Sequence, residues 1–199
     1  GVQDFVNADY VGANNNFTEC LSINTNNTPI KAQASFWRGE SRYHLDFLTD
    51  AAEDYKRFNS LSSSVSDEHL QAVGNYSLAY VYFKKKDFNR AAASFDKYIS
   101  YPKEFGSETY YDAISRLGDC AYYNRDFVKA ESYYSTVADA GCNSTPYGLF
   151  QQAFMMGLQK RYSEKQNVLD KLIAIYPKND YVDDAWLEKG NTSILQGEN

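Results

Sequence analysis

The residues that most often carry out catalysis are few in this sequence, and their spacing does not bring them together. Only two histidines, His44 and His69, occur among 199 residues. Neither has a Cys, Ser or acidic residue spaced to form a relay, whereas catalysis needs a nucleophile with a base, paired carboxylates or a metal cluster. We therefore predict no catalytic residue and no enzyme. We interpret His44 as a groove-lining or solvated side chain and His69 as a solvated one.

Metal and cofactor sites are not indicated either. Cys20, Cys120 and Cys142 give an odd count without CxxC spacing, so neither a zinc site nor a disulfide framework is expected. The glycines are scattered singly, and no Gly-rich phosphate-binding loop is present. We predict no metal and no cofactor.

Charge and composition exclude two further classes of function. The net charge is −6, and the Lys and Arg residues are spread among acids, so no basic stripe indicates a nucleic acid partner. No run of about 18 apolar residues is present, so we predict no transmembrane segment. The compositional excess is aromatic, with 18 Tyr and 12 Phe.

The clearest structural pattern lies between Leu117 and Tyr134. Twelve residues separate Gly118 from Ala130, and the aromatic Tyr134 follows four residues later. The Ala and the ring lie one turn apart on one helix face, where the small residue lets a partner helix come close and the ring fills the space beside it. This spacing predicts two helices joined by a tight turn.

The same spacing recurs along the chain. The position equivalent to Ala130 in the second helix falls at 13, 51, 91, 130 and 165, so the steps are 38, 40, 39 and 35 residues. Helix pairs at such a period bury their apolar faces only by stacking on neighbours, which predicts an all-α, right-handed superhelix with a concave and a convex side. Lys165 replaces the small residue in one copy, so we expect its stem to extend outward or its two helices to splay.

We predict one solenoid over residues 1–199, and we expect it to be a piece of a longer repeat protein. The expected units are 1–28 (second helix of a partial repeat), the repeats 30–66, 67–104, 105–143 and 144–178, and 180–199 (first helix of a truncated repeat).

These positions resemble the tetratricopeptide repeat, whose consensus runs Trp, Leu-Gly, Tyr, then Ala, an aromatic and a closing Pro. Trp37, Gly39 and Tyr43 match its first helix, while Arg38 stands where the consensus has Leu. The resemblance covers nearly the whole chain. It implies a protein-interaction scaffold whose ligands lie against the first helices of the repeats.

A more local similarity concerns the compartment. The closing Pro followed by an Asp-x-Ala start, as in Pro177 to Ala185, is similar to repeats of periplasmic cell-envelope proteins, including outer-membrane assembly lipoproteins and the Tol-Pal coordinator. This similarity implies a periplasmic or cell-envelope location, with a cytoplasmic location as the alternative.

The resemblance also implies which side chains line the concave groove. With the Gly or Ala of the first helix as position eight, inward-facing side chains come three before it, one after it and four or five after it. By that count the groove is aromatic and mildly acidic, and it lacks the Lys, Arg and Asn with which family members grip a peptide carboxylate. We therefore expect an extended or helical apolar segment of a partner protein, contacted mainly by rings. The predicted lining is Phe36, Glu40, Tyr43, His44, Tyr76, Tyr80, Phe83, Ser115, Asp119, Tyr122, Tyr123, Phe150 and Phe154.

Three alternatives stay open at this point. Many of these rings could instead pack between repeats, because a Tyr at the consensus position belongs to the core. The aromatic excess could also serve stacking on sugars in a carbohydrate-binding module, for which only Trp37 and Trp186 qualify. The chain could finally be a structural spacer. In every case, exposed apolar faces at the ends of the array could cause self-association.

Overall fold

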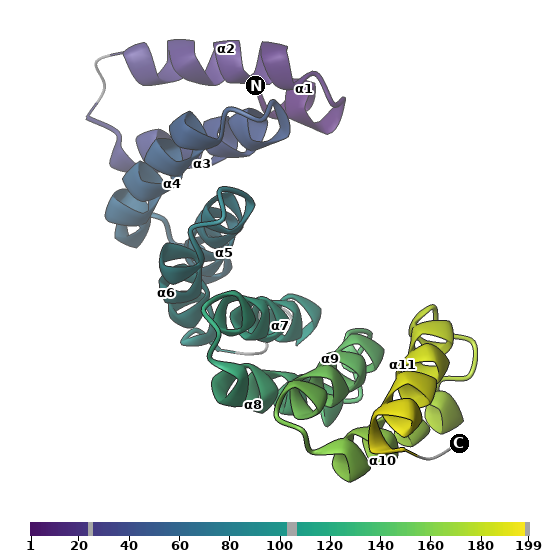
Figure 1. The fold of residues 1–199 in the computed structure, drawn as a ribbon. Coiled ribbons are helices and arrows are strands. Elements are labelled where there is room, and N and C mark those ends of the chain that lie inside the picture. Colours follow the sequence, from purple (N-terminus) through teal and green to yellow (C-terminus); the bar gives the residue numbers. More distant parts are fainter. Residues whose placement is uncertain (24–25, 103–106, 198–199) are drawn as a thin grey trace. The chain divides into compact units, whose positions relative to one another are not determined.

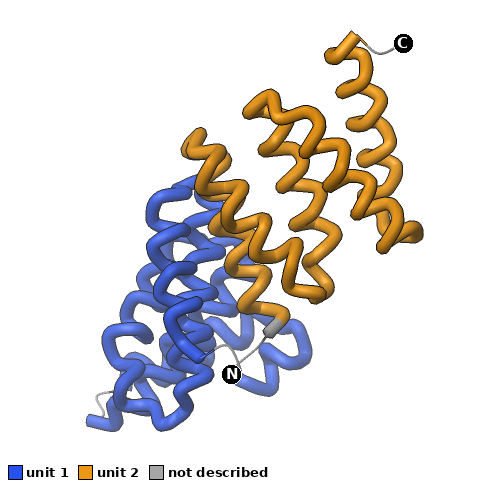
Figure 2. Tube along the Cα trace, turned by 90° about the horizontal axis from the view of Figure 1, so that it is seen from below, with its two compact units in different colours: residues 1–105 blue, residues 106–199 orange. Residues whose placement is uncertain are grey.

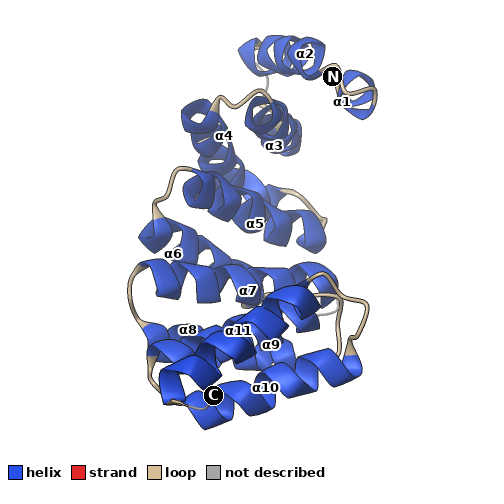
Figure 3. Ribbon diagram, turned by 45° about the vertical axis from the view of Figure 1, so that its right-hand side comes forward, coloured by secondary structure: helices blue, strands red, loops and turns tan. Residues whose placement is uncertain are grey.

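The structure is a computed structural model that describes residues 1–23, 26–102 and 107–197. Within these ranges the regular elements are helices, with no strand (Figures 1 and 3). The predicted all-α helical-repeat class is therefore confirmed. The chain forms two compact units, Gly1–Phe105 and Gly106–Asn199 (Figure 2).

In the first unit, each helix packs against the next one along the chain, and α3 also contacts α5. The short helix α1 in front of α2 is an addition that the sequence did not predict. The elements of this unit are α1 (Val2–Val6), α2 (Tyr10–Ser22), α3 (Thr28–His44), α4 (Leu48–Leu61), the 3₁₀ turn η1 (Ser62–Ser64), α5 (Glu68–Lys84) and α6 (Phe88–Ile99).

The second unit repeats this plan, with sequential packing and a further contact between α9 and α11. The predicted boundary between repeats 67–104 and 105–143 lies outside the described residues. The elements are α7 (Ser107–Tyr123), α8 (Phe127–Ala138), α9 (Thr145–Leu158), α10 (Tyr162–Ile175) and α11 (Tyr181–Gln196).

Five turns between paired helices share one backbone geometry. Each contains a non-glycine residue in the left-handed region, with φ between 59° and 63°, at positions 8, 46, 86, 125 and 160. At Lys86, the backbone N–H of that residue donates to the Phe83 carbonyl, and the N–H of Asp87 donates to the Tyr82 carbonyl. This pair of bonds is the Schellman motif. Asp87 then begins α6 by accepting a bond from the backbone N–H of Arg90.

The small residues occupy equivalent places in the repeats. Ala13, Ala51, Ala91 and Ala130 each lie five residues after a left-handed turn residue, and none is accessible to solvent. The structure thus confirms the repeat period read from the sequence.

Two departures from the consensus are explained by buried ion pairs. The expected outward path of Lys165 is wrong, because its side chain is 7% exposed and its Nζ lies 2.5 Å from Glu188 Oε2 on α11. Arg38 replaces the consensus Leu because it binds Asp54 on α4, with Nε and Nη2 at 2.9 and 2.5 Å from the two carboxylate oxygens. Arg42 Nη1 donates to the same carboxylate at 2.7 Å.

Candidate functional site

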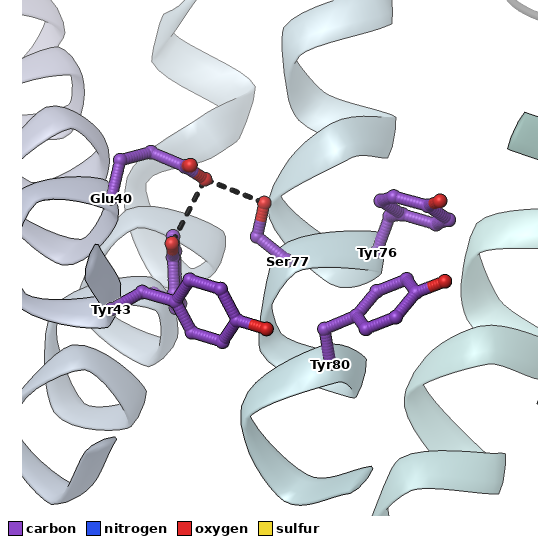
Figure 4. Close-up of a pocket in the computed structure, with 6 residues that line it drawn as sticks. Glu40, Tyr43, Tyr76, Ser77 and Tyr80 are labelled. Atoms are coloured by element: carbon purple, nitrogen blue, oxygen red, sulfur yellow. Dashed lines mark hydrogen bonds between the residues drawn. The ribbon is translucent and has the colours of Figure 1, made fainter. Parts of the chain in front are cut away.

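A cavity of about 150 Å³ opens between α3 and α5 in the first unit (Figure 4). We call it the Glu40 pocket. Four of the residues predicted to line a groove meet here, namely Glu40, Tyr43, Tyr76 and Tyr80. Tyr55 and Ser77, which the sequence reasoning did not select, complete the lining.

Helix periodicity explains why these side chains converge. Glu40 and Tyr43 are three residues apart on α3, and Tyr76 and Tyr80 are four residues apart on α5. Residues at these spacings share one helix face. Because α3 and α5 contact each other, the two faces meet, and Tyr55 reaches the pocket from α4.

The acidic group of the pocket is held by two hydroxyls. Glu40 Oε1 accepts hydrogen bonds from Tyr55 Oη at 2.8 Å and from Ser77 Oγ at 2.7 Å, as the dashed lines in Figure 4 show. Burial raises the pKa of Tyr55 well above its ordinary value, and the charge of Glu40 adds to this shift. Tyr55 therefore stays protonated and keeps donating to the carboxylate across the physiological pH range.

The aromatic walls are fixed by contacts with neighbouring rings. The Tyr76 and Tyr80 rings meet edge to face with centroids 5.0 Å apart, and Tyr80 packs on Phe95 of α6 at 5.3 Å. On α3, the Tyr43 ring makes a cation–π contact with the Lys84 ammonium, which lies 5.2 Å from the ring centroid. The wall residues are thus ordered by the packing of the unit.

Three other residues predicted to line the groove in the first unit lie elsewhere. Phe36 is only 4% exposed and packs on Phe58 with centroids 5.2 Å apart, so the prediction that it lines a groove is wrong. Its side chain packs into the core between α3 and α4, where ring contacts with α4 enclose it. His44 is exposed but stacks on Tyr10 of α2 at 4.3 Å, and Phe83 packs on Phe88 at 5.6 Å.

In the second unit, Asp119 stands at the position equivalent to Glu40, and side chains of the same unit cover its carboxylate. Asp119 is buried and accepts hydrogen bonds from Tyr134 Oη at 2.6 Å and Tyr147 Oη at 2.5 Å. Arg116 Nη1 lies 2.5 Å from the other oxygen of this carboxylate. Burial and the charge of Asp119 raise the pKa of Tyr134 and Tyr147 above the ordinary tyrosine value. The prediction that Asp119 faces a groove is therefore wrong, because these three partners enclose it.

The prediction that Ser115 lines the groove is also wrong. It is 1% exposed, and its hydroxyl donates to the Tyr111 carbonyl one turn earlier in α7 at 2.9 Å. The hydroxyl is thus used within its own helix, and no surface is left for a partner.

The four remaining predicted residues fall in two places of the second unit. Tyr122 and Tyr123 line a shallow cavity of about 380 Å³, together with Arg125, Phe127 and Leu158. Phe154 lies near Tyr122, with centroids 6.2 Å apart, and belongs to the same apolar cluster. Phe150 stacks on Tyr181 of α11 at 5.4 Å, as expected of a ring that packs between repeats.

A sequence signal for Tyr55 was present. In two copies, an acidic residue follows the Gly of the first helix and a Tyr stands fifteen residues later, as in Glu40 with Tyr55 and Asp119 with Tyr134. Where the residue after the small position is Tyr80, the partner fifteen residues later is Phe95, which has no hydroxyl. The pairing of acid with Tyr therefore predicts the hydrogen bond.

The described part of the chain offers neither a metal site nor a membrane span. There, no three His, Cys, Asp or Glu side chains gather closely enough to hold a metal ion. Within residues 1–23, 26–102 and 107–197, none of the helices has the length and apolar character needed to cross a bilayer.

Comparison of the sequence with protein-family models and with curated proteins finds no match. Solved structures are similar at the level of the fold. MamA matches with a TM-score of 0.71 and 17% identity, over 86% of this chain and 91% of that one. YrrB, described as a TPR protein with an unusual peptide-binding site, gives a TM-score of 0.66 and 17% identity over 92% and 84%.

A third structure is the C-terminal part of a TPR repeat-containing protein from Cytophaga hutchinsonii. It gives a TM-score of 0.74 and 17% identity, and the match covers 98% of this chain and 69% of that chain. Together with the five equivalent turns and the buried small residues, these similarities show that the chain has the fold of the tetratricopeptide-repeat proteins.

Proposed function

We propose that the protein is a non-enzymatic interaction scaffold that binds a segment of a partner protein at the Glu40 pocket. The observation that supports this most is the contrast between equivalent positions. Asp119 is covered by two tyrosines and an arginine, whereas Glu40 faces a cavity walled by Tyr43, Tyr76 and Tyr80. Aromatic walls offer a large contact area at a low cost in side-chain entropy. The fold similarity to YrrB, described as a peptide-binding TPR protein, agrees with this function.

The test is selection of peptides from a random displayed library on the immobilised protein, followed by fluorescence anisotropy with the selected peptides. Tyr80→Ala removes one wall of the pocket. The matched control is Tyr123→Ala, which removes an aromatic ring that is 56% exposed in the other unit. Circular dichroism establishes that both variants are folded.

We expect Tyr80→Ala to weaken binding at least about tenfold, as truncation of a central aromatic residue usually does. Tyr123→Ala should leave the affinity within about twofold. Selected peptides that bind both variants equally, or that lose binding only with Tyr123→Ala, would place the binding surface outside the Glu40 pocket.

The carbohydrate alternative has less support. Trp37 packs edge to face on Phe5 and Phe36, with centroids 5.3 Å apart in both cases, so its ring serves the core. Trp186 is 55% exposed and carries the Lys189 ammonium 5.1 Å from its centroid. Calorimetric titration with oligosaccharides is the direct test of this alternative.

Self-association and the compartment stay predictions. The last helix, α11, leaves four large apolar side chains more than half exposed, which is consistent with association through an end of the array. Sedimentation velocity of the wild type against a variant with polar replacements at these positions tests it. The four side chains are Trp186, Leu187, Ile194 and Leu195.

A further inference from the structure

The charge of Glu40 has no cationic partner among the residues that the structure describes. In the described part of the chain, its hydrogen bonds come from the neutral hydroxyls of Tyr55 and Ser77, and both reach Oε1. The Glu40 carboxylate is half-buried and lines an aromatic cavity. Such a group attracts a cation, repels an anion and is costly to cover with an apolar group.

The walls of the pocket are suited to a cation as well. The faces of tyrosine rings attract ammonium groups within about 6 Å of the centroid. The Tyr43 ring already binds the Lys84 ammonium in this way, at 5.2 Å. Lys84 Nζ forms an ion pair with Asp46, 2.7 Å from its Oδ1. Lys84 therefore does not compensate the charge of Glu40.

The second unit shows the complete arrangement. Asp119, equivalent to Glu40, has its hydroxyl donor Tyr134 fifteen residues later and a cation, Arg116, at 2.5 Å. The guanidinium carbon of Arg116 also lies 5.2 Å from the centroid of the Tyr147 ring. Arg116 stands two residues before Gly118, and the residue two before Gly39 is Trp37. Among the residues described in the first unit, Glu40 therefore has a hydroxyl donor and neighbouring rings, as Asp119 does, but no cation bound to its carboxylate.

We propose that the Glu40 pocket takes the ammonium group of a lysine side chain on the partner segment. This inference rests on the proposed function and specifies its ligand. The cavity is about 150 Å³, a volume that in an apolar engineered cavity accommodates the six carbons of benzene. The five heavy atoms of a lysine side chain fit this volume. The ammonium then meets the Glu40 carboxylate while the stem contacts Tyr76 and Tyr80.

The test titrates the protein with blocked amino acids as probes. Two-dimensional NMR measures the shifts of the tyrosine-ring resonances. N-acetyl-lysine methylamide carries the proposed group. N-acetyl-norleucine methylamide retains the stem without the charge, and N-acetyl-glutamate methylamide reverses the charge. Free n-butylammonium carries the same ammonium group on a four-carbon chain without a peptide backbone. Its affinity distinguishes a lysine side chain from a small free amine as the ligand.

The protein variants isolate the charge of one carboxylate. Glu40→Gln keeps an oxygen that accepts from Tyr55 and Ser77, so the fold is retained while the charge is lost. The matched control is Glu53→Gln, which removes the same charge from a side chain that is 66% exposed on α4.

We expect the lysine probe to shift the resonances of Tyr43, Tyr76 and Tyr80, with an affinity that falls at least about tenfold in Glu40→Gln and is unchanged in Glu53→Gln. The norleucine and glutamate probes should cause no shifts. Equal binding of norleucine, or full binding by Glu40→Gln, overturns the proposal. Tighter binding of n-butylammonium than of the lysine probe overturns the assignment to a lysine side chain.

The two proposals can fail separately. If library peptides bind in a Tyr80-dependent manner and replacement of their lysines by norleucine has no effect, the lysine inference is wrong and the scaffold function stands. If the lysine probe binds but no peptide does, the scaffold function is wrong.

Discussion

Three glycines of the first helices provide a graded test of the packing. An added Cβ would lie 2.5 Å from Tyr134 Cε1 at Gly118 and 3.0 Å from Tyr55 Cε1 at Gly39, and it would meet no atom within 4 Å at Gly190. Replacement by Ala therefore makes the same chemical change in three different spaces. We predict that the three variants differ in stability in the order of these distances.

The magnitudes follow from what each ring can do. At Gly190, Ala should stabilise by up to about 1 kcal/mol, because Ala is the better helix former. At Gly118, Tyr134 is 1% exposed and fixed to Asp119 at 2.6 Å, so the ring cannot move without straining that bond. Overpacking costs about 1–3 kcal/mol and the loss of a bond to a charged group about 1.5–3 kcal/mol, while Ala gains about 1 kcal/mol in helix propensity, so the net destabilisation is roughly 1.5–5 kcal/mol.

Gly39→Ala should be nearly neutral. Tyr55 borders the Glu40 pocket, so its ring can shift by a few tenths of an ångström into the cavity. The gain in helix propensity, about 1 kcal/mol, then offsets the remaining strain.

Urea unfolding followed by far-ultraviolet circular dichroism measures the three free energies. Because the chain has two compact units, hydrogen exchange of α7 and α8 should accompany it, to show that the loss in Gly118→Ala begins there. The reasoning is refuted if Gly118→Ala is as stable as Gly190→Ala, or if Gly190→Ala is the least stable of the three.

Three further predictions concern buried charged and hydroxyl groups. Lys165→Leu should lower the free energy of unfolding by about 1.5–3 kcal/mol, and adding Glu188→Leu should restore most of it in urea unfolding; a harmless single variant would contradict the ion pair. Asp54→Asn leaves Arg38 and Arg42 without their carboxylate, which should lower the free energy of unfolding by about 3–5 kcal/mol. Thermal unfolding measures this loss, and an unchanged melting temperature would argue against the ion-pair cluster. Burial raises the pKa of Tyr134, so the folded chain keeps a proton that the unfolded chain loses. Stability present below about pH 10 should therefore fall by about 1.4 kcal/mol per pH unit above it, and urea unfolding between pH 9 and 11 should show a shallower fall for Tyr134→Phe.

The period of small residues could be predicted because it depends on local spacing alone. Ala51, Ala91 and Ala130 are buried as expected, since each lies where a neighbouring helix comes close. The conformation of Lys165 could not be predicted, because its partner Glu188 lies on another helix pair. A count within one repeat contains no information about such a contact.

The candidate site was predictable to the same extent. Counting from Gly39 placed Glu40 and Tyr43 on one helix face, and both line the Glu40 pocket, because one helix face is a local property. Their contact with a partner stays a prediction. It failed for Phe36 and Asp119, since burial of these side chains depends on which residues of the next helices fill the space.

The Schellman turns have a consequence for the thermodynamics of association. The Tyr43 carbonyl accepts from the backbone N–H of Asp46 at 3.1 Å, which holds the last turn of α3, while Glu40 is tethered by Tyr55 and Ser77. A receptor so preorganised loses little motional freedom when it is occupied. The entropic penalty then falls mainly on the incoming segment, so a segment already helical or otherwise rigid should bind more tightly than a flexible one of the same composition.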